Sequence, residues 1–114
     1  MEDGIKEIIQ FAEFRTVLAN QMNILKETMK SKLVIHENGG TFLITPAFIG
    51  YVAALMSQSN SNYLLDENNT PIQIEDLKKF NEKVLSHYAD VMNAYYTEYQ
   101  KLRTKRNSQA VVGL

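Results

Sequence analysis

The sequence predicts a mainly helical α+β fold, in the order long helix, β-hairpin, short buried helix, β-hairpin, long helix. Both ends of the chain carry apolar residues at steps of three and four, which is the spacing of an amphipathic helix. Between them, residues 33–44 and 63–74 repeat one pattern thirty residues apart: an apolar run, a short polar turn and a second run in which apolar residues alternate. That pattern is typical of a β-hairpin.

The composition is that of one globular domain. The chain has 114 residues, 45% of them hydrophobic, which is enough for a modest core. We expect a single α+β domain over residues 1–106 and a C-terminal tail over 107–114. The 12 basic and 13 acidic residues give no overall charge suited to nucleic acid. The absence of cysteine excludes disulfides, thiolate metal sites and cysteine nucleophiles.

Two further absences bear on location. The first residues lack an apolar signal core, so we expect no secretory signal. The longest apolar stretch, residues 42–56, is interrupted and too short to span a bilayer, so we expect no transmembrane segment.

The first helix is predicted over residues 4–31. Asp3 is placed to cap it, and Glu7 suits the positive end of the helix dipole. One face carries an apolar stripe: Ile5, Ile8, Phe11, Phe14, Leu18, Met22, Leu25 and Met29. Polar residues recur every seven positions on another face: Lys6, Glu13, Asn20 and Glu27.

Both hairpins are predicted to gather apolar side chains on one face. In the first, Asn38 and Gly39 suit a type I′ turn, because both central residues of that turn need a positive φ. The turn brings four apolar side chains together as the cross-strand pairs Ile35–Phe42 and Leu33–Ile44, with His36 and Thr41 on the other face. By the same logic, the inner face of the second hairpin is expected to hold Tyr63, Leu65, Ile72 and Ile74. Pro71 is expected on an edge strand, and the hairpins are expected to join in one small sheet.

The short helix is predicted over residues 46–57. Thr45 is its expected N-cap and Pro46 its first helical residue. Apolar residues lie nearly all round it, which is typical of a helix buried on most sides, so we expect it to form the core. Gly50 is expected to permit the close approach of a neighbour.

The last helix is predicted over residues 75–106, with an apolar stripe from Leu77 to Leu102. Acidic residues at its start and basic residues at its end suit the helix dipole. The two outer helices would measure roughly 42 and 48 Å at 1.5 Å per residue, whereas a compact domain of this size has a radius of gyration of about 13 Å. We therefore expect them to pair with each other, with copies of the chain or with another partner.

Motifs that would indicate chemistry fail when their spacing is checked. His36 and His87 are not at ligand spacing. Residues 66–77 match a calcium loop only in part, because Pro71 replaces the required glycine and Leu77 the required glutamate. No serine has the glycines of a nucleophile elbow, and Gly39-Gly40 belongs to a hairpin rather than a phosphate loop. We therefore predict no catalytic residue, no metal site, no cofactor and no enzymatic activity.

The candidate partner-binding residues lie towards the end of the chain. For the tyrosines, three interpretations compete: packing against the first helix, an interface with another protein, and base stacking on single-stranded nucleic acid. The basic residues of 101–106 either form a solvated helix end or contact an acidic partner or nucleic acid. The apolar C-terminus either docks on a partner or frays. The candidates are Tyr95, Tyr96, Tyr99, Lys101, Arg103, Lys105, Arg106, Val112 and Leu114.

The segments LLDENNTPIQIEDLKKF (64–80) and EYQKLRTKR (98–106) resemble small uncharacterised proteins of T4-like tailed phages, and KSKLVIHENGGTFLITP (30–46) is similar in texture. The resemblance covers about residues 12–106. It implies a virion component or an assembly factor, located in the virion or the host cytoplasm. No functional residues are established for those proteins, so none carry over.

The leading hypothesis is a non-enzymatic structural or assembly protein of a tailed-phage particle. It would act through protein–protein contacts of its long helices and C-terminal tail, with copies of itself or with phage structural proteins. The alternative is a small regulatory or accessory module that binds host or phage transcription or replication machinery. A third hypothesis, an accessory protein for single-stranded nucleic acid, is the less favoured. No membrane and no small-molecule substrate is expected as a partner.

Overall fold

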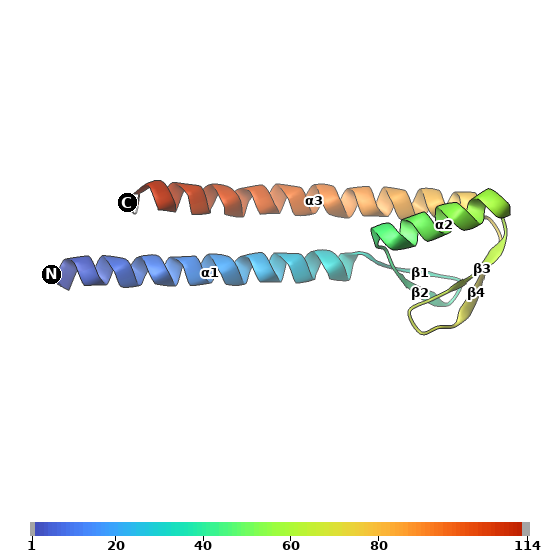
Figure 1. The fold of residues 1–114 in the computed structure, drawn as a ribbon, viewed down its shortest axis with the longest axis horizontal. Coiled ribbons are helices and arrows are strands. Elements are labelled where there is room, and N and C mark those ends of the chain that lie inside the picture. Colours follow the sequence, from blue (N-terminus) through green and yellow to red (C-terminus); the bar gives the residue numbers. More distant parts are fainter. Residues whose placement is uncertain (1, 113–114) are drawn as a thin grey trace. The chain divides into compact units, whose positions relative to one another are not determined.

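The computed structural model describes residues 2–112, with side chains over residues 3–107. The elements follow the predicted order (Figure 1): α1 (Glu2–Lys32), β1 (Val34–Glu37), β2 (Gly40–Leu43), α2 (Pro46–Gln58), β3 (Asn62–Leu65), β4 (Pro71–Ile74) and α3 (Leu77–Val112). The mainly helical α+β class is therefore confirmed.

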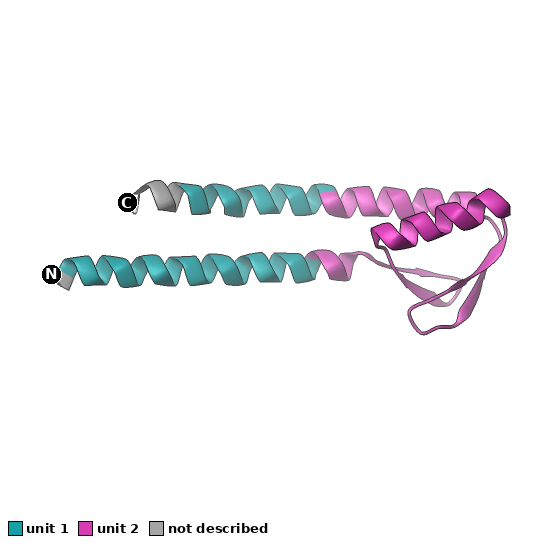
Figure 2. Cartoon of the chain, viewed as in Figure 1, with its two compact units in different colours: residues 1–28, 93–114 teal, residues 29–92 magenta. Residues whose placement is uncertain are grey.

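The chain divides into two compact units (Figure 2). We call residues 29–92 the hairpin unit; it contains both hairpins, α2 and the adjoining turns of α1 and α3. We call residues 1–28 together with 93–114 the helix-pair unit, because its described residues are the remaining parts of the two long helices.

The first hairpin has the predicted turn and register. Asn38 and Gly39 have φ angles of 49° and 83°, as a type I′ turn requires. β1 and β2 pair antiparallel in the predicted register, and the N–H of Ile44 donates to the carbonyl of Leu33 (2.8 Å), which extends the pairing beyond the strands. The four apolar side chains of the inner face are buried, so this prediction is confirmed.

The second hairpin has a different register from the predicted one. Leu64 lies opposite Ile72, which displaces the pairing by one residue relative to the first hairpin. The reason is the loop: residues 66–70 join β3 to β4, an odd number, whereas two residues join β1 to β2. A shift of one residue exchanges the two faces of a strand. Leu64 is therefore buried with Ile72 and Ile74, and the placement of Tyr63 and Leu65 on the inner face is wrong because both are exposed.

The hairpins form two separate two-stranded sheets, not the single sheet that was predicted. Three hydrogen bonds join them: the N–H of Glu67 donates to the carbonyl of Thr41 (2.9 Å), the N–H of Thr41 donates to Oδ2 of Asp66 (3.1 Å), and Nδ2 of Asn38 donates to the carbonyl of Gln73 (2.8 Å). Every strand of a two-stranded sheet is an edge strand, so Pro71 lies on an edge as predicted.

One glycine lies where the two hairpins touch. A Cβ atom added to Gly40 would lie 2.5 Å from Cγ1 of Ile72, so only glycine fits there without a displacement. The prediction of a close neighbour at Gly50 is wrong, because a Cβ atom added there meets nothing within 4 Å.

The core of the hairpin unit is formed by the hairpins and α3 rather than by α2. Only Val52 of α2 is buried, so the prediction that this helix forms the core is wrong: one face packs, and the rest is half-buried or exposed. The rings of Phe42, Phe48 and Phe80 contact one another, with centroids 5.6 to 6.3 Å apart. Thr45 caps α2 as predicted, since its Oγ1 accepts a hydrogen bond from the N–H of Phe48 (3.0 Å).

Three helix ends differ from the predicted ones. α1 begins at Glu2, so Asp3 lies in its first turn instead of capping it. α3 begins after Asp76, whose Oδ1 accepts a hydrogen bond from the N–H of Lys79 (3.1 Å) as an N-cap does. α3 then continues to Val112 instead of ending near residue 106.

The helix-pair unit places the first part of α1 beside the last part of α3 (Figure 2). Among its described side chains, over 3–28 and 93–107, only Leu18 is buried. Other members of the two predicted stripes are half-buried: Phe11, Phe14, Met22, Leu25, Tyr95, Tyr99 and Leu102. Ile5 and Ile8 belong to the predicted stripe of α1 but are exposed.

Candidate functional site

The basic residues at the end of α3 do not share one face. All four, Lys101, Arg103, Lys105 and Arg106, are exposed. Successive residues of a helix are turned by about 100°, which places Lys101 and Lys105 on one side of α3. Arg103 and Arg106 are neighbours on another side, about 100° or more around the helix. Nζ of Lys101 lies 3.0 Å from Oε1 of Glu98 in an exposed ion pair within the helix. The predicted cluster is therefore distributed around α3.

The three candidate tyrosines also divide into two groups. Tyr95 and Tyr99 are half-buried, and their ring centroids lie 6.0 Å apart with a tilt of 38° between the planes. Their burial supports packing within the helix-pair unit, which is the first of the three interpretations. Tyr96 is 62% exposed and remains available to a partner.

A groove of about 330 Å³ lies between the two helices of the helix-pair unit. It is lined by apolar and small side chains together with two guanidinium groups: Arg15, Leu18, Ala19, Met22, Asn23, Leu102 and Arg106. The guanidinium carbon of Arg15 lies 6.0 Å from the centroid of the Phe11 ring, at the outer limit of a cation–π contact. Arg106 was predicted as a candidate, whereas Arg15 was not. The signal that could have identified Arg15 is its position four residues after Phe11 on the stripe.

Two candidates lie outside the described residues. Leu114 is not described, and nothing of the Val112 side chain is described, although its backbone ends α3.

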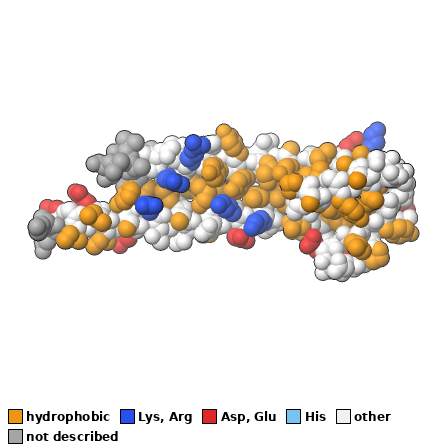
Figure 3. Space-filling model, viewed as in Figure 1, with side chains coloured by type: hydrophobic (Ala, Val, Ile, Leu, Met, Phe, Trp, Pro, Cys, Tyr) orange, Lys and Arg blue, Asp and Glu red, His pale blue; other side chains and the backbone are white. Residues whose placement is uncertain are grey.

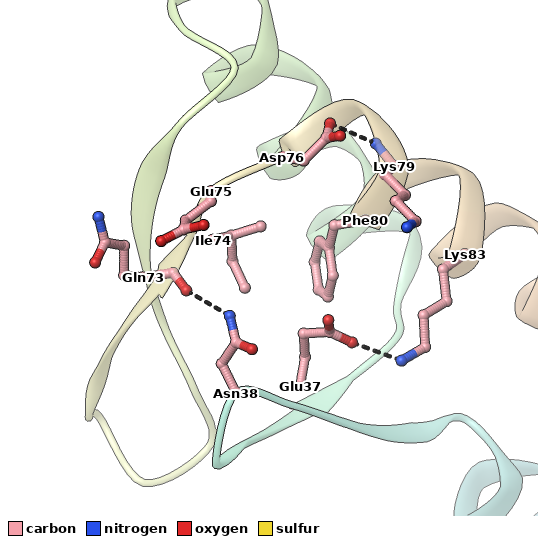
Figure 4. A pocket seen from close by; sticks show the side chains of 9 residues that line it. All are labelled: Glu37, Asn38, Gln73, Ile74, Glu75, Asp76, Lys79, Phe80 and Lys83. Atoms are coloured by element: carbon pink, nitrogen blue, oxygen red, sulfur yellow. Dashed lines mark hydrogen bonds and ion pairs between the residues drawn. The ribbon is translucent and has the colours of Figure 1, made fainter.

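A cavity of about 740 Å³ lies in the hairpin unit, between the first hairpin turn and the start of α3 (Figure 4). Nζ of Lys83 lies 2.6 Å from Oε2 of Glu37 on its wall. Nδ2 of Asn38 reaches across to the carbonyl of Gln73 on the second hairpin. These interactions tie the hairpins to each other and to α3, and they give this wall a structural role.

Asp66 is a buried carboxylate that sequence reasoning treated only as part of a turn. Its Oδ2 accepts a hydrogen bond from the N–H of Thr41 (3.1 Å), and its Oδ1 accepts from the N–H groups of Asn68 and Thr70 (2.9 Å each). These bonds, that from Thr41 first, hold the pKa of Asp66 below its ordinary value of 3.8, against the opposing effect of burial. Asp66 therefore fastens the loop of the second hairpin to β2.

Neither histidine lies in a cluster of metal ligands. Nδ1 of His36 is 3.1 Å from Oγ1 of Thr41, and Nε2 of His87 donates to the carbonyl of Lys32 (2.5 Å). Within the described part of the chain, no group of three His, Cys, Asp or Glu side chains is placed to hold a metal ion. No described helix combines the length and the hydropathy needed to cross a membrane.

The residues that sequence reasoning missed on the helix-pair unit are aliphatic. Ile9, Val17 and Ile24 of α1 are each exposed by half or more, and none belongs to the stripe that packs against α3. The signal for them was a second helical period on α1, offset from the first.

Comparisons of the chain with protein-family models, curated proteins and solved structures find no match.

Proposed function

We propose that this chain is a non-enzymatic structural or assembly protein of a tailed-phage particle, acting through protein–protein contacts of its helices. The observation that carries the proposal is an imbalance in the helix-pair unit between few buried and many exposed apolar side chains. One described side chain is buried there, whereas five large aliphatic side chains of α1 are exposed by half or more: Ile5, Ile8, Ile9, Val17 and Ile24.

The imbalance favours contact with another protein. Most helical stability in proteins comes from packing of an apolar face rather than from helix propensity. Exposed apolar patches larger than those of ordinary monomers mark sites of protein association. Hydrophobic side chains reach the surface near the N-terminal end of α1 (Figure 3). The helix-pair unit therefore has the surface of an incomplete helical assembly.

The sequence resemblance supports the setting. The segments 64–80 and 98–106 resemble small proteins of T4-like phages. A particle built from repeated protein contacts suits a chain that exposes aliphatic side chains along a helix.

Mass spectrometry of purified virions of the encoding phage tests this proposal. The proposal predicts the chain in intact particles at a reproducible copy number that survives a high-salt wash. Absence of the chain from virions, combined with no association with any structural protein in infected cells, would refute it.

A regulatory module that binds host or phage machinery is the second candidate, favoured by the exposed Arg103 and Lys105 of α3. The two candidates differ in what charge reversal does. For a regulatory module, Arg103→Glu with Lys105→Glu removes binding to an acidic partner. For an assembly protein, these changes leave incorporation into virions intact.

A further inference from the structure

Asn38 is the only asparagine of this chain that is followed by a glycine. In an Asn-Gly pair the backbone nitrogen of the glycine can attack the side-chain amide of the asparagine, because glycine has no Cβ atom to hinder the approach. Asn38 and Gly39 are both exposed, so the pair is in contact with solvent water. The pair therefore has the chemical requirements for loss of ammonia from the asparagine side chain.

The same asparagine helps to hold the two hairpins together (Figure 4). Its Nδ2 donates to the carbonyl of Gln73 (2.8 Å), which belongs to β4 of the second hairpin. Two residues further along, a Cβ atom added to Gly40 would lie 2.5 Å from Cγ1 of Ile72, so the hairpins are in close contact here. A chemical change at Asn38 therefore acts directly on the contact between the hairpins.

We propose that Asn38 is a site of spontaneous modification whose product weakens this contact. The nitrogen of Gly39 forms a bond to Cγ of Asn38 while the bond between Cγ and Nδ2 breaks, and ammonia leaves with the proton of the Gly39 N–H. Water then opens the resulting five-membered imide at either of its carbonyls. The product is an aspartate or an isoaspartate at position 38. This inference is independent of the proposed function.

The turn conformation slows the first step. Ring closure requires Cβ of Asn38 and the nitrogen of Gly39 to be nearly eclipsed about the Cα–C bond. In a type I′ turn, ψ of the first central residue is about 30°, which holds these two atoms roughly 150° apart. The reaction therefore requires the turn to open, and the hydrogen bond from Asn38 to Gln73 opposes that opening.

The product cannot restore the lost contact. A carboxylate at position 38 has no N–H to donate, so it would place acceptor oxygens against the carbonyl oxygen of Gln73. An isoaspartate also adds a backbone atom to a two-residue turn, and the turn sets the register of the first hairpin. The cavity beside the turn is already lined by two lysines and three carboxylates, so a further negative charge is unfavourable there: Lys79, Lys83, Glu37, Glu75 and Asp76.

Mass spectrometry of the full-length chain after incubation at mildly alkaline pH tests the chemistry. In the digest, we expect the peptide that contains residue 38 to show the mass increase of an amide converted to a carboxyl group. Chromatography should separate it into an aspartate form and an isoaspartate form. Asn38→Gly is the control, because Gly-Gly suits the same turn but carries no amide; it shows how much modification the other asparagines contribute.

The rate of modification tests the role of the hairpin contact. In urea that unfolds the chain, we expect Asn38 to react about tenfold faster or more than in the folded chain, because the open turn is a minor population of the native state. Gly40→Ala crowds Ile72 and should speed the reaction by about fivefold, the factor for a destabilisation of about 1 kcal/mol. Gly50→Ala meets no atom within 4 Å and should react no faster than the wild type.

Urea unfolding of the purified product tests the consequence. The added negative charge allows ion exchange to separate the modified chain from the unmodified one. We expect the modified chain to unfold at a lower urea concentration, and Asn38→Asp to shift in the same direction.

Three results would overturn the inference: no modification at residue 38 under these conditions, equal rates in the folded and the unfolded chain, or a modified chain that unfolds at the same urea concentration as the unmodified one. None of these results depends on whether the chain is found in virions.

Discussion

Replacement of glycine by alanine is expected to change the stability of the fold in opposite directions at two positions. It should destabilise the fold at Gly40, which lies at the contact between the two hairpins, and stabilise it at Gly50, which has no close neighbour. In Gly40→Ala, the new methyl group would lie 2.5 Å from Cγ1 of Ile72 and 3.1 Å from Cε2 of Phe42, both core residues. Overpacking of this kind costs about 1–3 kcal/mol, while replacing a glycine by alanine in a strand returns about 0.5–1 kcal/mol. The net expectation is a loss of about 1 kcal/mol, within a range of roughly 0–2.5 kcal/mol. In Gly50→Ala no atom lies within 4 Å of the new methyl group, so only the gain remains.

Urea unfolding followed by circular dichroism measures both effects, and a double-mutant cycle locates the first. Ile72→Ala removes Cγ1 and Cδ1, and as a large-to-small core change it costs about 2–5 kcal/mol by itself. In that background we expect Gly40→Ala to be neutral or stabilising, which gives a coupling free energy of about 1–3 kcal/mol. The reasoning is refuted if Gly40→Ala stabilises the wild type as Gly50→Ala does, or if its cost is unchanged when Ile72 is alanine.

Three further predictions concern the hairpin unit. Leu64→Ala should cost about 2–5 kcal/mol in urea unfolding and Leu65→Ala well under 1 kcal/mol, because only the first is buried; equal costs would contradict the register. Thr45→Ala should cost about 1 kcal/mol through loss of the α2 cap, with a fall in melting temperature as the readout, and an unchanged melting temperature would show that the cap contributes nothing. The pKa of Asp66 is lowered from 3.8, so its carboxylate stabilises the fold above that pH, and the stabilisation is lost as pH falls through the lower folded value. Asp66→Asn should therefore flatten the acid side of the stability profile below about pH 4. A profile identical to that of the wild type would contradict this.

The order of elements could be predicted because each has a local signal. The turn residues Asn38 and Gly39 determine both the turn type and the register of the first hairpin. The stripe of α3 was predicted at every position, and all its residues are buried or half-buried. Helical periodicity is visible in the sequence of one helix alone. It can therefore be recognised without knowing what the helix packs against.

The second hairpin and α2 could not be predicted in full, because their placement depends on non-local contacts. The loop of the second hairpin is held by Asp66, whose carboxylate reaches the N–H of Thr41, and no local pattern indicates that bond. The apolar composition of α2 shows that it prefers burial but not which face is covered, and Tyr51 remains exposed.

The candidate surface was predicted in part. Proximity in sequence suggested one basic cluster, but rotation along the helix distributes those residues around α3. Five exposed aliphatic residues of α1 carry the proposed function: Ile5, Ile8, Ile9, Val17 and Ile24. The first two were assigned to the packed stripe, and the other three were not considered. The burial of each side chain shows which residues of α1 pack and which remain exposed.

Quantitative mass spectrometry of purified virions of the encoding phage tests the proposed function most directly. We expect the chain in intact particles at a copy number that is reproducible between preparations and unchanged by a high-salt wash. Particles that contain their structural proteins but lack this chain would contradict the account.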